Sequence, residues 1–490
     1  MQNTGQKNDR KEASRTRESR KGYLCEQGNG SFSWIRGSLM RLTRLAVVAV
    51  CVVALAGVAL ADTYTWDNGA ADTDWSSGAN WNPEDGNEPP GAGDTAKVFP
   101  LANGNTTCTV DADTQVDSVD AKFTGGSNDR YITLDVPDRN NPTTLTVDTS
   151  FGIGLRGRPP GWGPSHVYCS LAGTTSLLQA GGKTVLYQAN TYSGGTTIDN
   201  SLANAYGSVL ELSADGALGS GAVTINAGQL RVKASQSAGM PDVTVNNGAE
   251  LNMSGDIPAG TTVTLNAGAF LGGSSDPGRS WVCNSDINVA GNAEIGGGGR
   301  TSWYSATYRG DIIGSADVTL SYDPRGESPH NQTSYLDKAN VSFQGNWIVA
   351  EGYLVAKQVG CMGTGQFVYV KGGAELELDV AGAISPDTAL CLLEGSTGFL
   401  DLDANNAVLA CNVGGTYDTL LKEVVGGTWL PAGDYDSSTS NPAGVTLADY
   451  FDFGSSTLTV LNEGLPRPIA EPAGLSLLGL ALLGLRKKRS

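Results

Sequence analysis

"VTINAGQL" at residues 223–230 is the stretch that decides the fold, because it returns twice at a fixed distance. "VTVNNGAEL" follows at 243–251 and "VTLNAGAFL" at 263–271, so the three copies start 20 residues apart. Looser copies are "INVAGNAEI" at 287–295 and "VYVKGGAEL" at 368–376. Each copy has two apolar residues flanking a polar one, then small residues that include Gly, then another apolar residue.

This pattern predicts an all-β chain. Alternation places both apolar side chains on one face of a strand, and Gly allows the bend that turns the next apolar residue inward. A coil of about 20 residues cannot bury that face alone, so coils must stack at about 4.8 Å. We therefore predict a right-handed parallel β-helix. An antiparallel β-sandwich is the alternative, because its strands also recur every 8–12 residues, but the fixed spacing favours the β-helix.

The charge balance excludes one class of partner. Residues 62–485 contain 46 acidic and 18 basic side chains, a net charge of about −28 within a chain of −18 overall. Such a surface repels phosphate, so we expect no nucleic-acid binding. Gly contributes 66 of the 490 residues, which suits many short strands joined by turns.

Residues 40–61 have the layout of a secretory signal peptide. Arg41 and Arg44 precede an apolar run that ends in Ala59 and Ala61, so cleavage is expected before Asp62. Residues 1–39 are polar and aperiodic, which indicates a disordered extension or a start assigned too early.

The C-terminus has three parts: a Pro-rich spacer at 465–472, an apolar run at 473–485, and a basic block before the last Ser. As a helix this apolar run spans roughly 20 Å, less than the roughly 30 Å hydrocarbon core. The layout resembles a PEP-CTERM sorting signal, although Ala470 stands where the family has its first Pro. The residues that carry the resemblance are Ala470, Glu471, Pro472, Arg486, Lys487, Lys488 and Arg489.

That resemblance implies a route and a destination. It implies transport by the export machinery, transient inner-membrane association through 473–490, and processing by an exosortase-like enzyme. The product would lie at the cell surface or in the extracellular matrix of a biofilm, where extracellular polysaccharide is an expected partner.

A longer unit at 186–230 resembles the autotransporter-associated β-strand repeat of exported β-helical proteins. "NTYSGGTT" at 190–197 and "GALGSG" at 216–221 carry this resemblance. A degenerate copy spans 341–376, with Gly363-Thr364-Gly365 in place of Gly219-Ser220-Gly221. We therefore expect a Trp-rich N-terminal capping region at 62–123 and the β-helix at 124–464.

Two further groups of residues suggest specific roles. Trp66, Trp75 and Trp81 could stack on sugar rings or cover the open end of the β-helix. Cys391 and Cys411 are one coil apart by the spacing of the repeats, which predicts a disulfide between them.

The sequence shows no catalytic motif and implies no cofactor. His166 and His330 are expected in loops rich in Gly, Pro and polar residues, and the sequence contains no GxSxG or HExxH. Three Asp-x-Asp pairs could bind a hard cation such as Ca²⁺, or serve as acid and base in polysaccharide cleavage. We expect a non-catalytic surface or matrix protein; the alternative is a carbohydrate-binding adhesin or a polysaccharide-degrading β-helix enzyme. The pairs are Asp72 with Asp74, Asp401 with Asp403, and Asp434 with Asp436.

Overall fold

The structure is a computed structural model of the chain. It describes residues 61–70, 72–82, 88–100, 104–123, 131–155, 163–202, 207–273, 280–296, 305–321, 333–393, 399–418, 423–442 and 445–462. The extension at 1–39, the signal peptide up to residue 60, and the spacer and sorting segment at 465–490 lie outside these residues.

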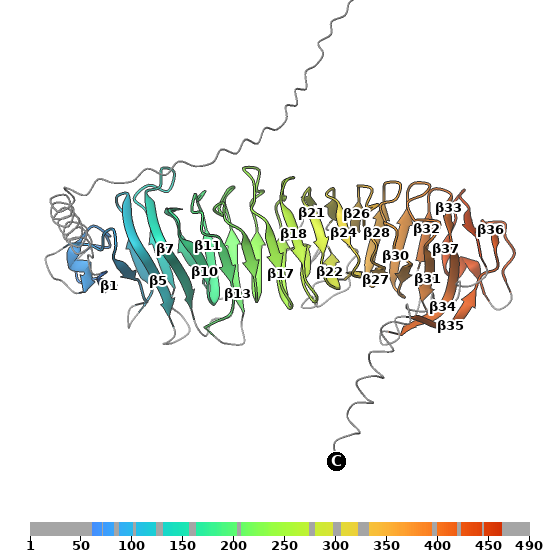
Figure 1. Ribbon diagram of the computed structural model, residues 1–490, viewed down its shortest axis with the longest axis horizontal. Helices are drawn as coiled ribbons and strands as arrows, with labels where there is room; N and C mark the ends of the chain where they lie inside the picture. Colours follow the sequence, from blue (N-terminus) through green and yellow to red (C-terminus); the bar gives the residue numbers. More distant parts are fainter. Residues whose placement is uncertain are drawn as a thin grey trace, which may run out of the picture. The chain divides into compact units, whose positions relative to one another are not determined.

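Two long sheets carry most of the strands, which follow one another along the stack in chain order (Figure 1). Sheet A contains β1 (Thr63–Trp66), β2 (Trp81–Asn82), β3 (Thr95–Lys97), β5 (Thr114–Phe123), β7 (Thr144–Leu155), β9 (Ser170–Ala172), β10 (Ser176–Gln179), β12 (Thr196–Ile198), β14 (Val223–Ile225), β16 (Val243–Val245), β18 (Thr262–Leu265), β21 (Asp286–Val289) and β24 (Ile312–Gly314). Sheet B contains β4 (Thr106–Thr109), β6 (Ile132–Asp135), β8 (Ser165–Val167), β11 (Gly182–Leu186), β13 (Ser208–Leu212), β15 (Gly228–Val232), β17 (Ala249–Met253), β19 (Phe270–Gly273), β22 (Ala293–Gly296), β25 (Val318–Leu320), β27 (Trp347–Val349), β29 (Phe367–Val370), β31 (Ala389–Leu393), β34 (Ala410–Asp418) and β35 (Glu423–Trp429).

Two smaller sheets complete the stack. Sheet C contains β20 (Trp281–Cys283), β23 (Ser305–Tyr308), β26 (Thr333–Leu336), β28 (Gly352–Ala356), β30 (Ala374–Leu378), β32 (Phe399–Leu402) and β37 (Phe451–Asp452). Sheet D contains β33 (Asn406–Val408), β36 (Gly433–Tyr435) and β38 (Leu458–Val460). The described helices are two short 3₁₀ turns, η1 (Gly78–Asn80) and η2 (Leu447–Asp449). In the described part of the chain, no helix reaches the length and apolarity needed to cross a bilayer.

The register confirms the predicted parallel β-helix. Val223 pairs with Val243, Val243 with Val263, and Val263 with Ile287, so the sequence copies lie directly above one another. Leu230, Leu251, Leu271 and Ile295 form the matching column in sheet B. The predicted coil length holds from β14 to β18, whereas the pairing of Ile287 with Ile312 closes a longer coil.

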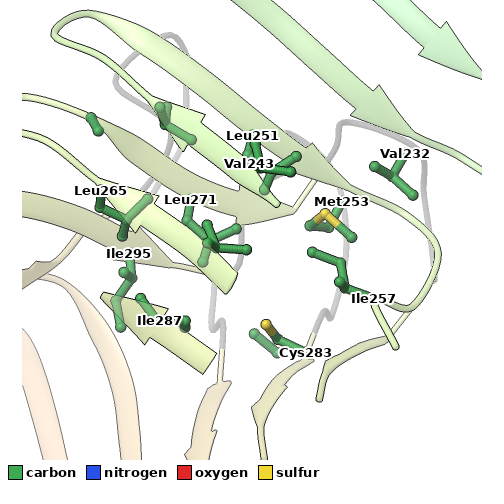
Figure 2. Close-up of a cluster of buried hydrophobic side chains, with 14 of the residues drawn as sticks. Val232, Val243, Leu251, Met253, Ile257, Leu265, Leu271, Cys283, Ile287 and Ile295 are labelled. Carbon is green, nitrogen blue, oxygen red and sulfur yellow. The ribbon is translucent and has the colours of Figure 1, made fainter. Parts of the chain in front are cut away.

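The inward columns make one continuous apolar interior. Figure 2 shows Leu251, Leu265, Leu271, Ile287 and Ile295 pointing toward one another from strands of sheets A and B. All five are buried, and the same core cluster runs from Trp66 to Val460. Burying a side chain of this size stabilises the fold by roughly 1.5–3 kcal/mol, so each coil is stabilised mainly by its neighbours.

The two longer sequence units share the same corner geometry. Asn190 accepts a hydrogen bond from Leu171 N of the preceding coil and donates one to the carbonyl of Ala217 in the following coil. Asn340 makes the equivalent pair with Ile312 N at 2.9 Å and Cys361 O at 2.7 Å. Each buried amide therefore links three consecutive coils, and the corner at Asn340, directly before 341–376, has the same hydrogen bonds as the corner at Asn190 within 186–230.

The ends of the stack differ from the predicted boundaries. Parallel pairing begins at β1 with β3 and continues from β3 to β5, so coils already occupy the region at 62–123 that was predicted as a cap. At the other end, β35 pairs antiparallel with β34, and β36 with β38. β35 and β36 are thus the edge strands of sheets B and D, whereas sheet C ends on β37, which pairs parallel with β32.

The corner glycines give a test of the coil geometry. A Cβ at Gly219 would clash with the carbonyl oxygen of Tyr192, a backbone atom of the preceding corner. We expect Gly219→Ala to lower the free energy of unfolding by about 2 kcal/mol, since a packed corner cannot yield cheaply. Gly104→Ala is the control, because a Cβ there meets nothing within 4 Å. Chemical denaturation of both variants measures the difference; equal stability would contradict the corner packing.

Candidate functional site

The last coils of sheet C bring carboxylates together on the outer face. Glu377 pairs with Asp401 across β30 and β32, and Asp401 pairs with Asp452 of β37, so three acidic side chains stand in one outward column. Strands repeat at about 4.8 Å, which places like charges at neighbouring rungs. We call this group the acidic surface; its members are Glu375, Glu377, Asp379, Asp401, Asp403 and Asp452.

This crowding changes the protonation of the group. Partial burial raises the pKa of Glu377 to about 7, with further contributions from its hydrogen bond to Asp379 and the nearby carboxylates. Burial and the neighbouring Asp403 and Asp452 also raise the pKa of Asp401. Lys357 lies 3.8 Å from Asp379, so one cation offsets part of the charge. A carboxylic acid that holds its proton near neutral pH can act as a proton donor.

The same oxygens can serve as ligands. Glu377, Asp379 and Asp403 each offer one carboxylate oxygen, and these oxygens lie within 4.8 Å of one another. Hard cations such as Ca²⁺ take carboxylate oxygens in flexible geometry. The structure thus places one of the three Asp-x-Asp pairs, Asp401 with Asp403, in a cluster of carboxylates that could bind a cation.

The other two Asp pairs take part in hydrogen bonds within the chain. Asp72 accepts hydrogen bonds from Ser77 Oγ at 3.0 Å and Asn80 Nδ2 at 2.9 Å. Asp436 accepts from Ser438 N at 2.8 Å, and so closes a turn. Asp434 accepts from Thr459 Oγ1 of the paired strand β38 at 2.7 Å. The hydrogen bonds of Asp72, Asp434 and Asp436 therefore fix local structure.

Burial contradicts the predicted glycan contact of the three tryptophans. Trp66, Trp75 and Trp81 are 2%, 1% and 0% exposed. Their rings pack edge to face, with Trp81 between the other two at centroid distances of 5.1 and 4.7 Å. Trp81 Nε1 donates to Trp75 O at 2.9 Å. The rings fill the interior of the first coils of the stack, so their faces are covered by protein.

The predicted disulfide between Cys391 and Cys411 is wrong. Both thiols are free and buried. Cys391 pairs with Asn412, and Leu390 pairs with Cys411, so this coil is one residue longer than the coils on which the prediction was based. A shift of one residue sends the two side chains to opposite faces of the sheet. Accordingly Cys411 lies in the main core, whereas Cys391 packs with Ile348 and Tyr369 outside it.

The structure reveals an aromatic group that the sequence reasoning missed. His166 lies in β8, in contrast to the loop expected for it, and Tyr168 and Tyr187 stack beside it on the outer face of sheet B. The signal was present as two tyrosines separated by nearly one coil, but tyrosine at that spacing also suits the core. His330 lies outside the described residues.

Only some of the residues predicted to direct export and sorting lie in the described part of the chain. Asp62 is exposed and its carbonyl accepts from Thr95 N at 2.8 Å, so the expected mature start leads directly into sheet A. Ala61 is also exposed. Ala59 and the sorting residues Ala470, Glu471, Pro472, Arg486, Lys487, Lys488 and Arg489 lie outside the described residues.

The acidic surface predicts a pH dependence of stability. Because the pKa of Glu377 exceeds its ordinary value of 4.5, the folded protein retains a proton that the unfolded chain has released between about pH 4.5 and 7. The contribution to stability is complete below pH 4.5 and is lost as pH rises to about 7. We expect Glu377→Gln to remove this loss, so that its Tm exceeds that of the unmodified protein at pH 8.

The control for this prediction is Glu88→Gln, which changes an exposed glutamate far along the chain. Thermal unfolding between pH 4 and pH 8 measures all three proteins. A Tm difference between Glu377→Gln and the unmodified protein that is the same at every pH would refute the assignment of the raised pKa.

Comparison with known proteins gives no match: no family model, no curated protein and no solved structure is similar to this chain. Its function is therefore inferred from its residues and their geometry.

Proposed function

We propose that the chain is a non-catalytic, exported structural protein of the cell surface or extracellular matrix. The observation that carries the proposal is the uninterrupted core, which joins the described coils from Trp66 to Val460 into one stack. Such a stack is stiff along its axis, because each coil is hydrogen-bonded to its neighbours. Its outward side chains are free to meet the surroundings without affecting the core.

The two ends of the sequence support export and sorting. Cleavage after Ala61 would release a chain whose first residue, Asp62, already borders β1. At the other end the apolar run at 473–485 is short for a permanent anchor. We infer that this run holds the chain in the inner membrane only until an exosortase-like enzyme cleaves near Ala470–Pro472.

Peptide mass spectrometry of the native cell tests this route. We expect surface and secreted fractions to contain a chain that starts at Asp62 and lacks residues 473–490. Pro472→Ala should leave the intact tail in the inner membrane, because it removes the last residue of the sorting motif. Pro468→Ala is the matched control, since it changes a proline of the same spacer outside the motif.

Intact 473–490 peptides from the unmodified protein at steady state in the inner membrane would contradict processing. Equal processing of Pro472→Ala and Pro468→Ala would show that the motif is not what the enzyme reads.

A second candidate is a polysaccharide-cleaving enzyme, favoured by the acidic surface. Glu377 keeps its proton near pH 7 beside Asp401, and a protonated and an ionised carboxyl are the groups that glycoside hydrolysis requires. Reducing-end assays on a panel of polysaccharides test it. If the unmodified protein cleaves a polysaccharide and Glu377→Gln does not, the enzyme replaces the structural protein as the proposed function. If the unmodified protein cleaves none, the structural proposal stands.

A further inference from the structure

The outer face of sheet B carries a column of side chains at equivalent positions of successive coils. Tyr168 N donates to Leu134 O, Tyr187 N to Val167 O, Ser213 N to Leu186 O, and Lys233 N to Leu212 O. These bonds extend the parallel ladder, so Tyr168, Tyr187, Ser213 and Lys233 occupy the same place on four successive coils. Their predecessors along the chain point into the core or border it, so these four side chains point outward.

Aromatic and cationic groups stack within this column. The rings of Tyr168 and Tyr187 lie 4.3 Å apart at 16°, and the guanidinium of Arg139 covers the other face of Tyr168 at 3.6 Å. His166 Nδ1 lies 3.1 Å from the hydroxyl of Tyr187. Asp135 holds Arg139 in place with two hydrogen bonds, at 2.9 and 2.8 Å. The stack is therefore fixed before any ligand arrives.

One ring face of the stack borders a small residue. Tyr168 covers one face of Tyr187, and the opposite face looks toward the next coil, where the column holds Ser213. Lys233 follows on the coil after that, so two steps of about 4.8 Å separate the rungs of Tyr187 and Lys233. A serine side chain cannot fill the height between a tyrosine ring and a lysine stem.

Positive charge gathers beside that place. Lys183, Arg231 and Lys233 surround the carboxylate of Glu211, at 2.7, 3.5 and 3.4 Å. Glu211 is buried, whereas Lys233 keeps about a third of its side chain exposed. Glu250 also belongs to this network, because its carboxylate accepts from Gln229 Nε2 at 2.8 Å and Gln229 Oε1 accepts from Arg231. Three cations therefore stand against two carboxylates, a local balance that differs in sign from that of the whole chain.

We propose that this surface binds an acidic polysaccharide, with one sugar ring packed on the open face of Tyr187 above Ser213 and its carboxylate beside Lys233. An aromatic face contacts the apolar face of a pyranose, and ammonium and guanidinium groups bind carboxylates in charge-assisted hydrogen bonds. A neutral glycan would gain nothing from the cations, and the acidic remainder of the protein would repel an anion everywhere else. The proposal rests on the extracellular location proposed above, because such polymers are met outside the cell.

The test measures retardation of the purified full-length protein in native gels that contain polygalacturonate or neutral dextran. We expect retardation by polygalacturonate alone, weakened by added salt. Lys233→Gln should lower the apparent affinity by about ten-fold, as expected when a charged hydrogen bond is lost. Ser213→Leu should do the same by covering the open face of Tyr187.

Matched controls separate the site from general charge and shape effects. Lys338→Gln removes the same type of charge elsewhere; the Lys338 side chain is 43% exposed, against 34% for Lys233, and it also pairs with a carboxylate. Thr224→Leu enlarges an outward side chain on sheet A. Both controls should bind as the unmodified protein does, and circular dichroism checks the fold of every variant.

Three outcomes would overturn the proposal: no retardation by polygalacturonate, equal retardation by dextran, or equal affinity of the site and control variants. Because two site variants change different groups, misfolding of one leaves the other as a test. The binding assay is independent of processing, so its failure would leave the mass-spectrometric result on export unaffected, and the reverse also holds.

Discussion

The in-register stacking of coils is the constraint on which the rest of this structure depends. Most strands are too short to be stable alone, and their few inward side chains become a core only when the next coil repeats them. A shift of one residue would turn Val243 and Val245 toward solvent and Thr244 inward. The pairing of Val263 with Ile287 shows that the register is kept even where the coil lengthens.

Coil length varies because the outer parts of each coil are not bound by this rule. The corners at Asn190 and Asn340 lie on different sides of the stack. The corner at Asn340 lies on the side of sheet A, because the nearby Phe343 pairs with Gly314 of β24. The corner at Asn190 lies on the side where sheet C begins: its partner Gly216 binds Gln236, which bonds to Asp256 beside the bridge from Ile257 to β20. The same type of corner can therefore stand in place of a strand of sheet C early in the stack and in place of a strand of sheet A later in the stack. Outward positions are not constrained by the core, and they include the acidic surface on sheet C and the column of Tyr168, Tyr187, Ser213 and Lys233 on sheet B.

The repeating coils could be predicted from the sequence, whereas contacts that depend on the pairing register of a single residue could not. The three copies at 223–271 were enough for the parallel β-helix, because periodic apolar residues report directly on the core. The same reasoning failed for Cys391 and Cys411, since one additional residue in that coil reverses the face without leaving a visible mark in the pattern. The N-terminal tryptophans were ambiguous because aromatic residues suit both a core and a sugar platform, and only packing decides. The clustering of Glu377 with Asp403 required the register of β30 and β32, which spacing alone could not supply.

Pulsed electron paramagnetic resonance on spin-labelled pairs tests the stacking most directly. Leu178, Thr197, Thr224 and Ile313 stand in one outward column of sheet A, and the six cysteines of the described chain are buried and so protected from labelling. With one label at Ile313, partners at Thr224, Thr197 and Leu178 should give separations of about 19, 24 and 29 Å, because each coil adds about 4.8 Å. Separations that do not grow by a constant step would contradict in-register coils and favour a sandwich of antiparallel strands.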